Sequence, residues 1–164
     1  GGAAVVGAWG GGQCYASAAA VCGGRQWGMG GGLKSFPKTE DQINLVYTGS
    51  QAYSIAGVGP YGDASRNHLA YNGAYMPAQG SKGGGALTEA EILAVVCDER
   101  YTIGGADPAS TQWSAEYNKW CAEGNPIYAG LQDGSITFDN ITTTAAGKGV
   151  LPVGTTPRAG KGPR

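Results

Sequence analysis

The clearest pattern of hydrophobic and polar positions lies between Thr88 and Arg100 and predicts an amphipathic helix. Thr88 and Glu91 have the spacing of a capping box, in which the two side chains accept hydrogen bonds from each other's backbone N–H groups. Apolar residues then follow at positions that form one buried face: Ile92, Leu93, Val95 and Val96. Gly104 and Gly105 close the segment.

A second helical pattern covers Thr39 to Tyr47. Thr39 is a suitable N-cap, and the acidic residues Glu40 and Asp41 suit the first turn of a helix. The apolar residues recur every three to four positions: Ile43, Val46 and Tyr47. We expect this helix to end at Gly49, because glycine is the preferred residue just after a helix.

A third helix is expected to begin at Asp107-Pro108, with proline at the first helical position. Its apolar side chains form a stripe that needs a surface to pack on: Trp113, Tyr117, Trp120 and Cys121. Such a stripe is more often core or interface packing than a platform for a ligand. We refer to these four residues as the aromatic stripe.

The segments between and after these helices lack a sustained period. Residues 50–85 form a long loop region, which in a compact domain is usually functional or wrapped around something. Residues 125–141 read as irregular, with one short strand at Ser135–Phe138. Residues 142–164 carry four basic residues and no acidic one, and they predict an extended basic tail. Such a tail is either a solvated end or an arm lying along another subunit.

Composition limits the classes of function. A chain of 164 residues forms one domain, with room for an appendage. The net charge of −1 gives no electrostatic footprint for nucleic acid, and no apolar run approaches the length of a membrane span. With 31 glycines, the fold needs something extra to stabilise it: a cofactor, disulfides or a partner. The chain begins at Gly1 without Met, which suggests a processed N-terminus.

Four cysteines in a glycine-rich chain with few charges favour an oxidising, extracytoplasmic compartment. Cys97 and Cys121 fall on apolar faces of adjacent predicted helices, so a disulfide is expected, with two buried free thiols as the alternative. Cys14 and Cys22 are too far apart to be bridged on one straight helix. A structural zinc site is the rival interpretation, but the four cysteines form no C-x-x-C pair and the one histidine, His68, is distant in sequence.

No pattern in the sequence nominates an enzyme. The glycine-rich runs lack the phosphate-binding arrangement, and no Ser/His/Asp set accompanies His68, which we interpret as a surface or loop histidine. The carboxylates are scattered without a pair suited to acid–base work. We therefore expect no catalytic activity and no small-molecule substrate.

Three segments that are separated along the chain form a distinctive pattern through their order and their spacing. The first, within an alanine-rich segment that favours a helix, has Gly11, then Tyr15, then Ala19-Ala20-Val21-Cys22-Gly23. The second is Ser35-Phe36-Pro37-Lys38-Thr39-Glu40-Asp41-Gln42-Ile43, with Gly49-Ser50 after it. The third is Tyr75-Met76-Pro77 followed by the capped helix that ends in Glu99-Arg100.

Together these segments resemble the bacterial class I cytochrome c family, in particular actinobacterial-type domains, over about residues 11–104. The resemblance implies an all-α fold in which the first and last helices cross, with Gly11 allowing close approach near Val95–Asp98. It also implies haem c, with Met76 as distal ligand and Tyr71 and Tyr75 at the haem edge. On this interpretation residues 1–104 are the cytochrome c-like domain, 105–141 a helical or irregular extension and 142–164 the tail.

The sequence departs from the family at the attachment motif. Ala19 and Gly23 stand where the family has Cys and His, so Cys22 would form a single thioether. Two functions follow from the resemblance. One is an electron-transfer subunit of a membrane-associated respiratory or photosynthetic complex. The other is a haem-less cytochrome fold that docks neighbouring subunits through the aromatic stripe and the basic tail.

Overall fold

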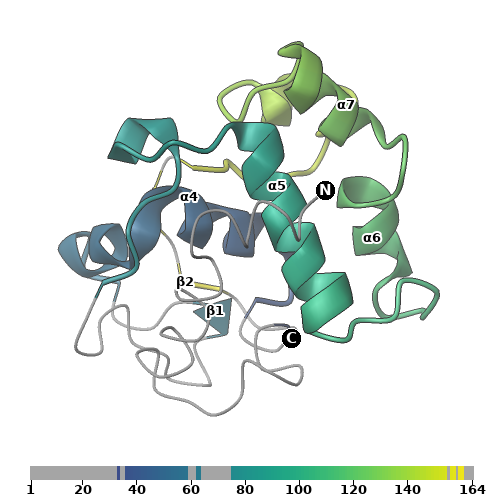
Figure 1. The fold of residues 1–164 in the computed structure, drawn as a ribbon, viewed down its shortest axis with the longest axis horizontal. Helices are drawn as coiled ribbons and strands as arrows, with labels where there is room; N and C mark the ends of the chain where they lie inside the picture. Colours follow the sequence, from purple (N-terminus) through teal and green to yellow (C-terminus); the bar gives the residue numbers. More distant parts are fainter. Residues whose placement is uncertain are drawn as a thin grey trace.

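Two helices that cross at the centre of the molecule organise the fold: α4 (Thr39–Ile55) and α5 (Glu89–Asp98) (Figure 1). The computed structural model describes residues 33, 36–58, 62–63, 75–154, 156–157 and 159–160, with 62–63 and 159–160 described by their backbone alone.

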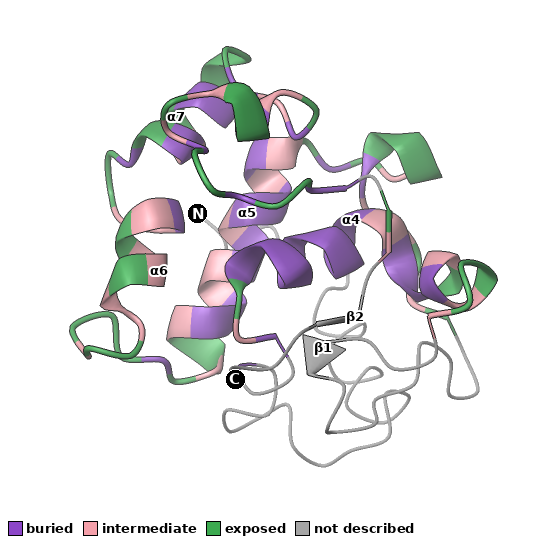
Figure 2. Ribbon diagram, turned by 180° about the vertical axis from the view of Figure 1, so that it is seen from behind, coloured by how far each residue is buried: buried purple, intermediate pink, exposed green. Residues whose placement is uncertain are grey.

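Two further helices, α6 (Ser114–Trp120) and α7 (Pro126–Asp133), pack on α5 on the side away from α4 (Figures 1 and 2). A π-helical turn, η3 (Glu99–Ile103), continues α5, and two short 3₁₀ turns are η2 (Ser81–Gly83) and η4 (Ile141–Thr143). The strands β1 (Gly62–Asp63) and β2 (Ala159–Gly160) pair in parallel, with Gly62 opposite Ala159 and Asp63 opposite Gly160. The described part is thus essentially helical, in agreement with the all-α class expected from the sequence.

One cluster of buried apolar side chains joins all four helices to the segment after them. It runs from Ile43 on α4 through Ile92 and Val96 on α5 to Val150 and Val153 near the end of the chain. Figure 2 shows the buried residues of α4 and α5 where the two helices cross. Val150 and Val153, which fall within the predicted basic tail, therefore pack on this chain's own core, which neither interpretation of that tail anticipated. The domain boundaries placed after residues 104 and 141 remain predictions.

The start of α5 matches the capping box expected from the sequence. Glu91 N donates to Thr88 Oγ1 over 3.2 Å, and Thr88 N donates to Glu91 Oε2 over 2.8 Å. Two backbone donors that the first helical turn leaves unpaired are satisfied in this way. The prediction of a capped helix here is confirmed.

The ends of α4 differ from those expected. Lys38, not Thr39, is the N-cap, because the Thr39 hydroxyl donates to Glu116 instead of capping its own helix. The helix also continues past Gly49, which has φ 74° and ψ 163° and produces a kink, and it ends at Ile55. The stop expected at Gly49 is therefore confirmed in part, because the regular helix is interrupted at Gly49, but a second helical stretch follows and runs to Ile55.

The C-terminal helices also differ from expectation. Asp107-Pro108 begins a turn in which Asp107 Oδ1 accepts from Ala109 N, and α6 begins only at Ser114. Helix α7 was not predicted, although Asn125 caps it, proline occupies its first turn and a left-handed glycine, Gly134, ends it. The strand expected at Ser135–Phe138 is a turn that buries Ile136 and Phe138.

Among the residues described, none of the helices combines the length and the apolar character needed to cross a bilayer.

Candidate functional site

Backbone groups of Met76 form hydrogen bonds with Ser50 at the kink of α4. Met76 N donates to Ser50 Oγ over 2.7 Å, and Ser50 N donates to the Met76 carbonyl oxygen over 3.1 Å. Ser50 N can make this bond because the kink turns it away from the carbonyl of Val46, its partner in a regular helix. The kink and the position of Met76 are thus one feature of the structure.

The carbonyl groups that the kink releases find new donors in the residues after Met76. Gln79 N donates to the Val46 carbonyl over 3.1 Å, and Gly80 N donates to the Tyr47 carbonyl over 3.0 Å. Buried backbone groups need such partners, because leaving one unpaired costs about as much free energy as a lost hydrogen bond. Residues 76–80 therefore replace the hydrogen bonds that α4 gives up at its kink.

Gly49 allows this close approach. A Cβ atom at residue 49 would lie 2.6 Å from Ala78 N and 2.7 Å from the Met76 carbonyl oxygen. The positive φ of 74° adds a second reason for glycine, since side chains disfavour that conformation. The Gly49-Ser50 pair in the sequence was the signal for this contact, although Ser50 was not singled out as a partner of Met76.

The Met76 side chain is half-buried against a small apolar cluster that is separate from the main core. The buried members of this cluster are Phe36, Leu45 and Tyr53, with Val58 beside them. The Tyr53 hydroxyl donates to Asn44 Oδ1 over 3.1 Å, which fixes the ring of that tyrosine. The thioether therefore lies among apolar side chains contributed by both halves of α4 and by the segment before it.

Of the other residues expected at a haem site, the structure describes Tyr75 alone. Tyr75 is exposed, with 41% of its surface accessible. Tyr71, Cys22, Ala19, Gly23, His68 and Cys14 lie outside the described residues. Within the described part of the chain, no group of three or more His, Cys, Asp or Glu side chains could hold a metal ion.

Next to this apolar cluster, Arg100 is buried in η3, directly after α5, and joins it to the segment before α4. Its Nη1 donates to the Phe36 carbonyl over 2.7 Å and to Gln42 Oε1 over 3.1 Å, and its Nη2 donates to the Pro37 carbonyl over 2.9 Å. Burial lowers the pKa of Arg100 from its ordinary value. The guanidinium also lies 5.3 Å from the centre of the Trp113 ring, a cation–π contact.

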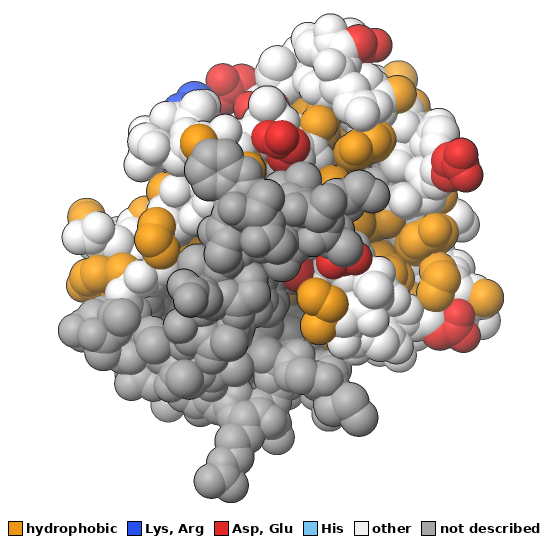
Figure 3. Space-filling model, viewed as in Figure 1, with side chains coloured by type: hydrophobic (Ala, Val, Ile, Leu, Met, Phe, Trp, Pro, Cys, Tyr) orange, Lys and Arg blue, Asp and Glu red, His pale blue; other side chains and the backbone are white. Residues whose placement is uncertain are grey.

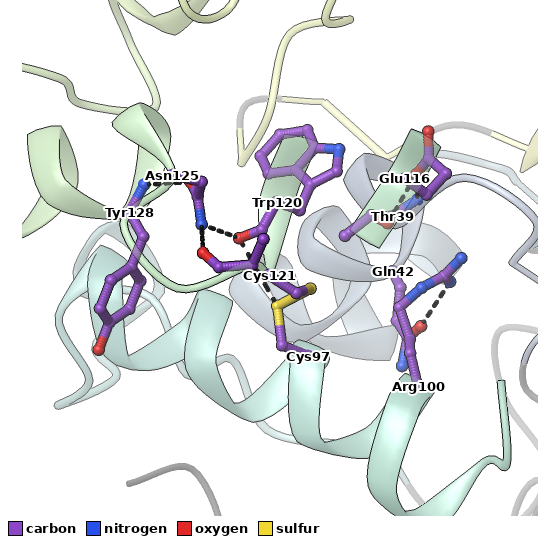
Figure 4. Close-up of a disulfide and its surroundings, with 10 residues drawn as sticks. Thr39, Gln42, Cys97, Arg100, Glu116, Trp120, Cys121, Asn125 and Tyr128 are labelled. Atoms are coloured by element: carbon purple, nitrogen blue, oxygen red, sulfur yellow. Dashed lines mark hydrogen bonds between the residues drawn. A yellow bond between two sulfur atoms is a disulfide. The ribbon is translucent and has the colours of Figure 1, made fainter. Parts of the chain in front are cut away.

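A second polar contact joins the start of α4 to α6. Thr39 N and Thr39 Oγ1 both donate to Glu116 Oε2, over 2.9 and 2.7 Å (Figure 4). Burial, and then the neighbouring carboxylates of Glu116 and Asp41, raise the pKa of Glu40. These contacts set the position of α4, and with it the kink that holds Met76.

The disulfide expected between Cys97 and Cys121 is present, with an S–S distance of 2.07 Å, and it joins α5 to the end of α6. Cys97 Sγ also lies 3.8 Å from the Trp120 carbonyl oxygen (Figure 4). The amide of Asn125 organises the turn that follows, because its Nδ2 donates to the Trp120 and Ala122 carbonyls. The sequence prediction for this pair of cysteines is confirmed.

The aromatic stripe packs on α5 and η3 of the same chain. Trp120 is fully buried in the core, Trp113 covers Arg100, and the Tyr117 ring meets the Tyr101 ring edge-on at 4.9 Å. The expectation that this stripe docks a neighbouring subunit therefore needs correction for Trp113 and Trp120, whose partner is their own chain. The physical reason is that α5 and η3 present an apolar and cationic surface directly opposite them.

A groove of about 650 Å³ lies over the disulfide, between α5, α6 and α7. Its walls include the two sulfur-bearing residues, three tyrosines and two acids. The lining residues include Cys97, Asp98, Tyr101, Tyr117, Glu123 and Tyr128. We call it the tyrosine groove. Sequence reasoning missed it, because its far wall is α7, the helix that was not predicted.

No protein-family model, characterised protein or solved structure shows significant similarity to this chain.

Proposed function

We propose that this chain is a cytochrome c-like electron-transfer subunit in which the Met76 thioether is an axial ligand of haem iron. The observation that supports the proposal is the paired hydrogen bonding of Ser50 and Met76 at the kink of α4. A ligand residue must be held so that its side chain keeps one position, and here both backbone groups of Met76 are bonded. The apolar cluster of Phe36, Leu45 and Tyr53 beside the side chain is a suitable surrounding for a haem ligand.

The residues present fit one side of a haem. A thioether sulfur is a good ligand for low-spin haem iron and raises its reduction potential. Bound haem would supply reversible transfer of one electron, a role for which the protein needs no nucleophile or general base. On the opposite side the fit fails by sequence, because Gly23 has no side chain to ligate iron and Ala19 cannot form a thioether. Cys22 would then be the single covalent link.

The proposed setting is the extracytoplasmic face of a membrane, within a respiratory or photosynthetic complex. The Cys97–Cys121 disulfide supports an oxidising compartment, since such bonds are rare where thiols are kept reduced. The partners would be other protein subunits of that complex.

A haem-less subunit is the second candidate, and the residues at positions 19 and 23 favour it. In that case the Ser50–Met76 contact has a structural role only, and the chain acts by binding its neighbours. Fold resemblance cannot decide between the two, because function belongs to the site.

The visible spectrum of the purified full-length chain, together with its intact mass, tests the proposal. A reduced α-band and a mass larger than that of the polypeptide by one haem support electron transfer. Met76→Ala is then expected to remove the sulfur-to-iron charge-transfer band and to lower the potential. Met29→Ala is the matched control, since Met29 is the chain's other methionine, and it should leave both unchanged.

A featureless visible spectrum with the unmodified polypeptide mass would overturn the electron-transfer proposal and leave the docking subunit. If the chain has a haem spectrum and Met76→Ala does not alter it, the assignment of Met76 as an axial ligand is overturned, but the proposal that haem is bound stands.

A further inference from the structure

The tyrosine groove is lined by residues of α5, α6 and α7, and α6 and α7 lie on the side of α5 away from α4 (Figure 1). Its volume of about 650 Å³ is within the usual range for sites that hold a ligand or a large side chain. One wall is α5 with η3, which carry Cys97, Asp98 and Tyr101, and the others are α6 with Tyr117 and α7 with Tyr128. Residues from three helices therefore converge on one concave surface.

The groove is built rigidly. The disulfide fixes α6 to α5 at its base. Asn125 fixes the turn between α6 and α7, because its Oδ1 also accepts from Tyr128 N over 2.8 Å. A surface held in this way loses little conformational entropy when it binds a partner.

The charge of the groove has one sign. Among the residues that line it, the charged ones are Asp98 and Glu123, and both are acids. Neither carboxylate makes a hydrogen bond or ion pair with any other residue that the structure describes. Figure 3 shows carboxylates among hydrophobic side chains over α6 and α7, and no Lys or Arg is visible on that part of this face. The groove is thus complementary to a cation.

The tyrosines add a preference for the shape of that cation. The faces of aromatic rings attract positive charge, and three tyrosines line the groove: Tyr101, Tyr117 and Tyr128. A guanidinium is planar, so it stacks on aromatic rings and forms two parallel hydrogen bonds to a carboxylate. An ammonium group is a compact point charge and lacks both of these abilities.

We propose that the tyrosine groove binds an arginine side chain presented by an extended segment of a partner protein. The guanidinium pairs with Asp98 and Glu123, and its alkyl stem lies against the tyrosine rings. This proposal does not depend on bound haem, and the docking it describes uses the side of α5 away from α4.

The test uses the full chain and the peptide Ac-Gly-Gly-Arg-Gly-Gly-NH2, with binding followed by the NMR signals of the tyrosine rings. Three analogues replace the arginine by citrulline, lysine or norleucine. We expect the arginine peptide to bind best and to weaken as salt is added, because exposed charge pairs are screened. The citrulline and norleucine peptides should give no shift of these rings.

The variant Asp98→Asn with Glu123→Gln should weaken binding of the arginine peptide by about five- to tenfold, as expected for two partly exposed ion pairs. Asp139→Asn is the matched control, because Asp139 pairs with Lys82 and does not line the groove. It should leave binding unchanged. Circular dichroism and the unfolding midpoint confirm that the variants are folded.

Three outcomes would overturn the proposal. One is binding of the citrulline peptide as tight as that of the arginine peptide. Another is a double variant that binds like the wild type. The third is tighter binding of the norleucine peptide, which would identify the groove as a site for an apolar segment. Since none of these readouts involves haem, they are separate from the spectroscopic test above.

Discussion

Ser50 and Met76 hold each other by two hydrogen bonds although they are 26 residues apart in the chain. One bond uses the Ser50 hydroxyl and the other uses the Ser50 backbone N–H that the kink of α4 sets free. The position of Met76 therefore depends on the shape of α4 as much as on its own loop. Substitutions at Gly49 and at Ser50 separate these two contributions.

Gly49→Ala should destabilise the fold strongly, by more than about 2 kcal/mol, because the new Cβ would meet Ala78 N and the Met76 carbonyl at under 3 Å. Gly57→Ala is the matched control: Gly57 also has a positive φ, of 72°, but nothing lies within 4 Å of its added Cβ. It should cost only the backbone term, about 1 kcal/mol. Chemical denaturation measures both, and equal losses would contradict the close-approach argument.

Ser50→Ala should lower the free energy of unfolding by about 1 kcal/mol or more, because it leaves the Met76 N–H without its acceptor. The matched control is Ser54→Ala in the same half of α4, where alanine should be neutral or slightly stabilising. If haem is bound, Ser50→Ala should also weaken the methionine-dependent absorption band. A variant as stable as the Ser54 control would show that the hydroxyl bond contributes nothing.

Glu40→Gln should stabilise the protein at neutral pH. Burial, followed by Glu116 and Asp41, raises the pKa of Glu40 above its ordinary value of 4.5, so the folded state holds this proton more tightly than the unfolded state. Stability from this group is therefore lost as pH rises from 4.5 through the raised value. We expect the free energy of unfolding of Glu40→Gln to exceed that of the wild type by on the order of 1 kcal/mol at neutral pH, and this difference should disappear in acid. Urea denaturation at a series of pH values measures it.

Asp133→Asn should change the stability of the protein at neutral pH in the opposite direction to Glu40→Gln. Hydrogen bonds from Ser135 lower the pKa of Asp133, so its contribution is present at neutral pH and is lost as pH falls through the lowered value. This variant should therefore be destabilising at neutral pH and neutral in strong acid. A Glu40→Gln variant that follows the same pH trend as Asp133→Asn would contradict the account of Glu40.

Replacing both Cys97 and Cys121 by Ser should lower the free energy of unfolding by about 3 kcal/mol, since the bond closes a loop between residues 24 apart. Cys97→Ser alone should cost nearly the same, because either change removes the bond. Denaturation with and without reductant measures the effect. Wild-type protein whose stability equals that of the double variant in the absence of reductant would contradict it.

The sequence by itself determined the features that depend on neighbours along the chain. The capping box of Thr88 and Glu91 could be predicted because its partners are three residues apart, and its hydrogen bonds form within one turn. The Cys97–Cys121 disulfide followed from two cysteines on apolar faces of adjacent helices. Helix α7 was within reach as well, since Asn125, Pro126 and Gly134 are ordinary start and stop signals.

The tertiary structure decided what depends on distant segments. Whether α4 stops or kinks at Gly49 depends on the donors that Gln79 and Gly80 bring to its freed carbonyls. The burial of Val150 and Val153 depends on the core that α4 and α5 have already formed. Arg100 reaches Phe36, 64 residues away, and the tyrosine groove exists only where three helices meet. Spacing along a chain encodes contacts within a helical turn, whereas these contacts arise only once separate elements pack together.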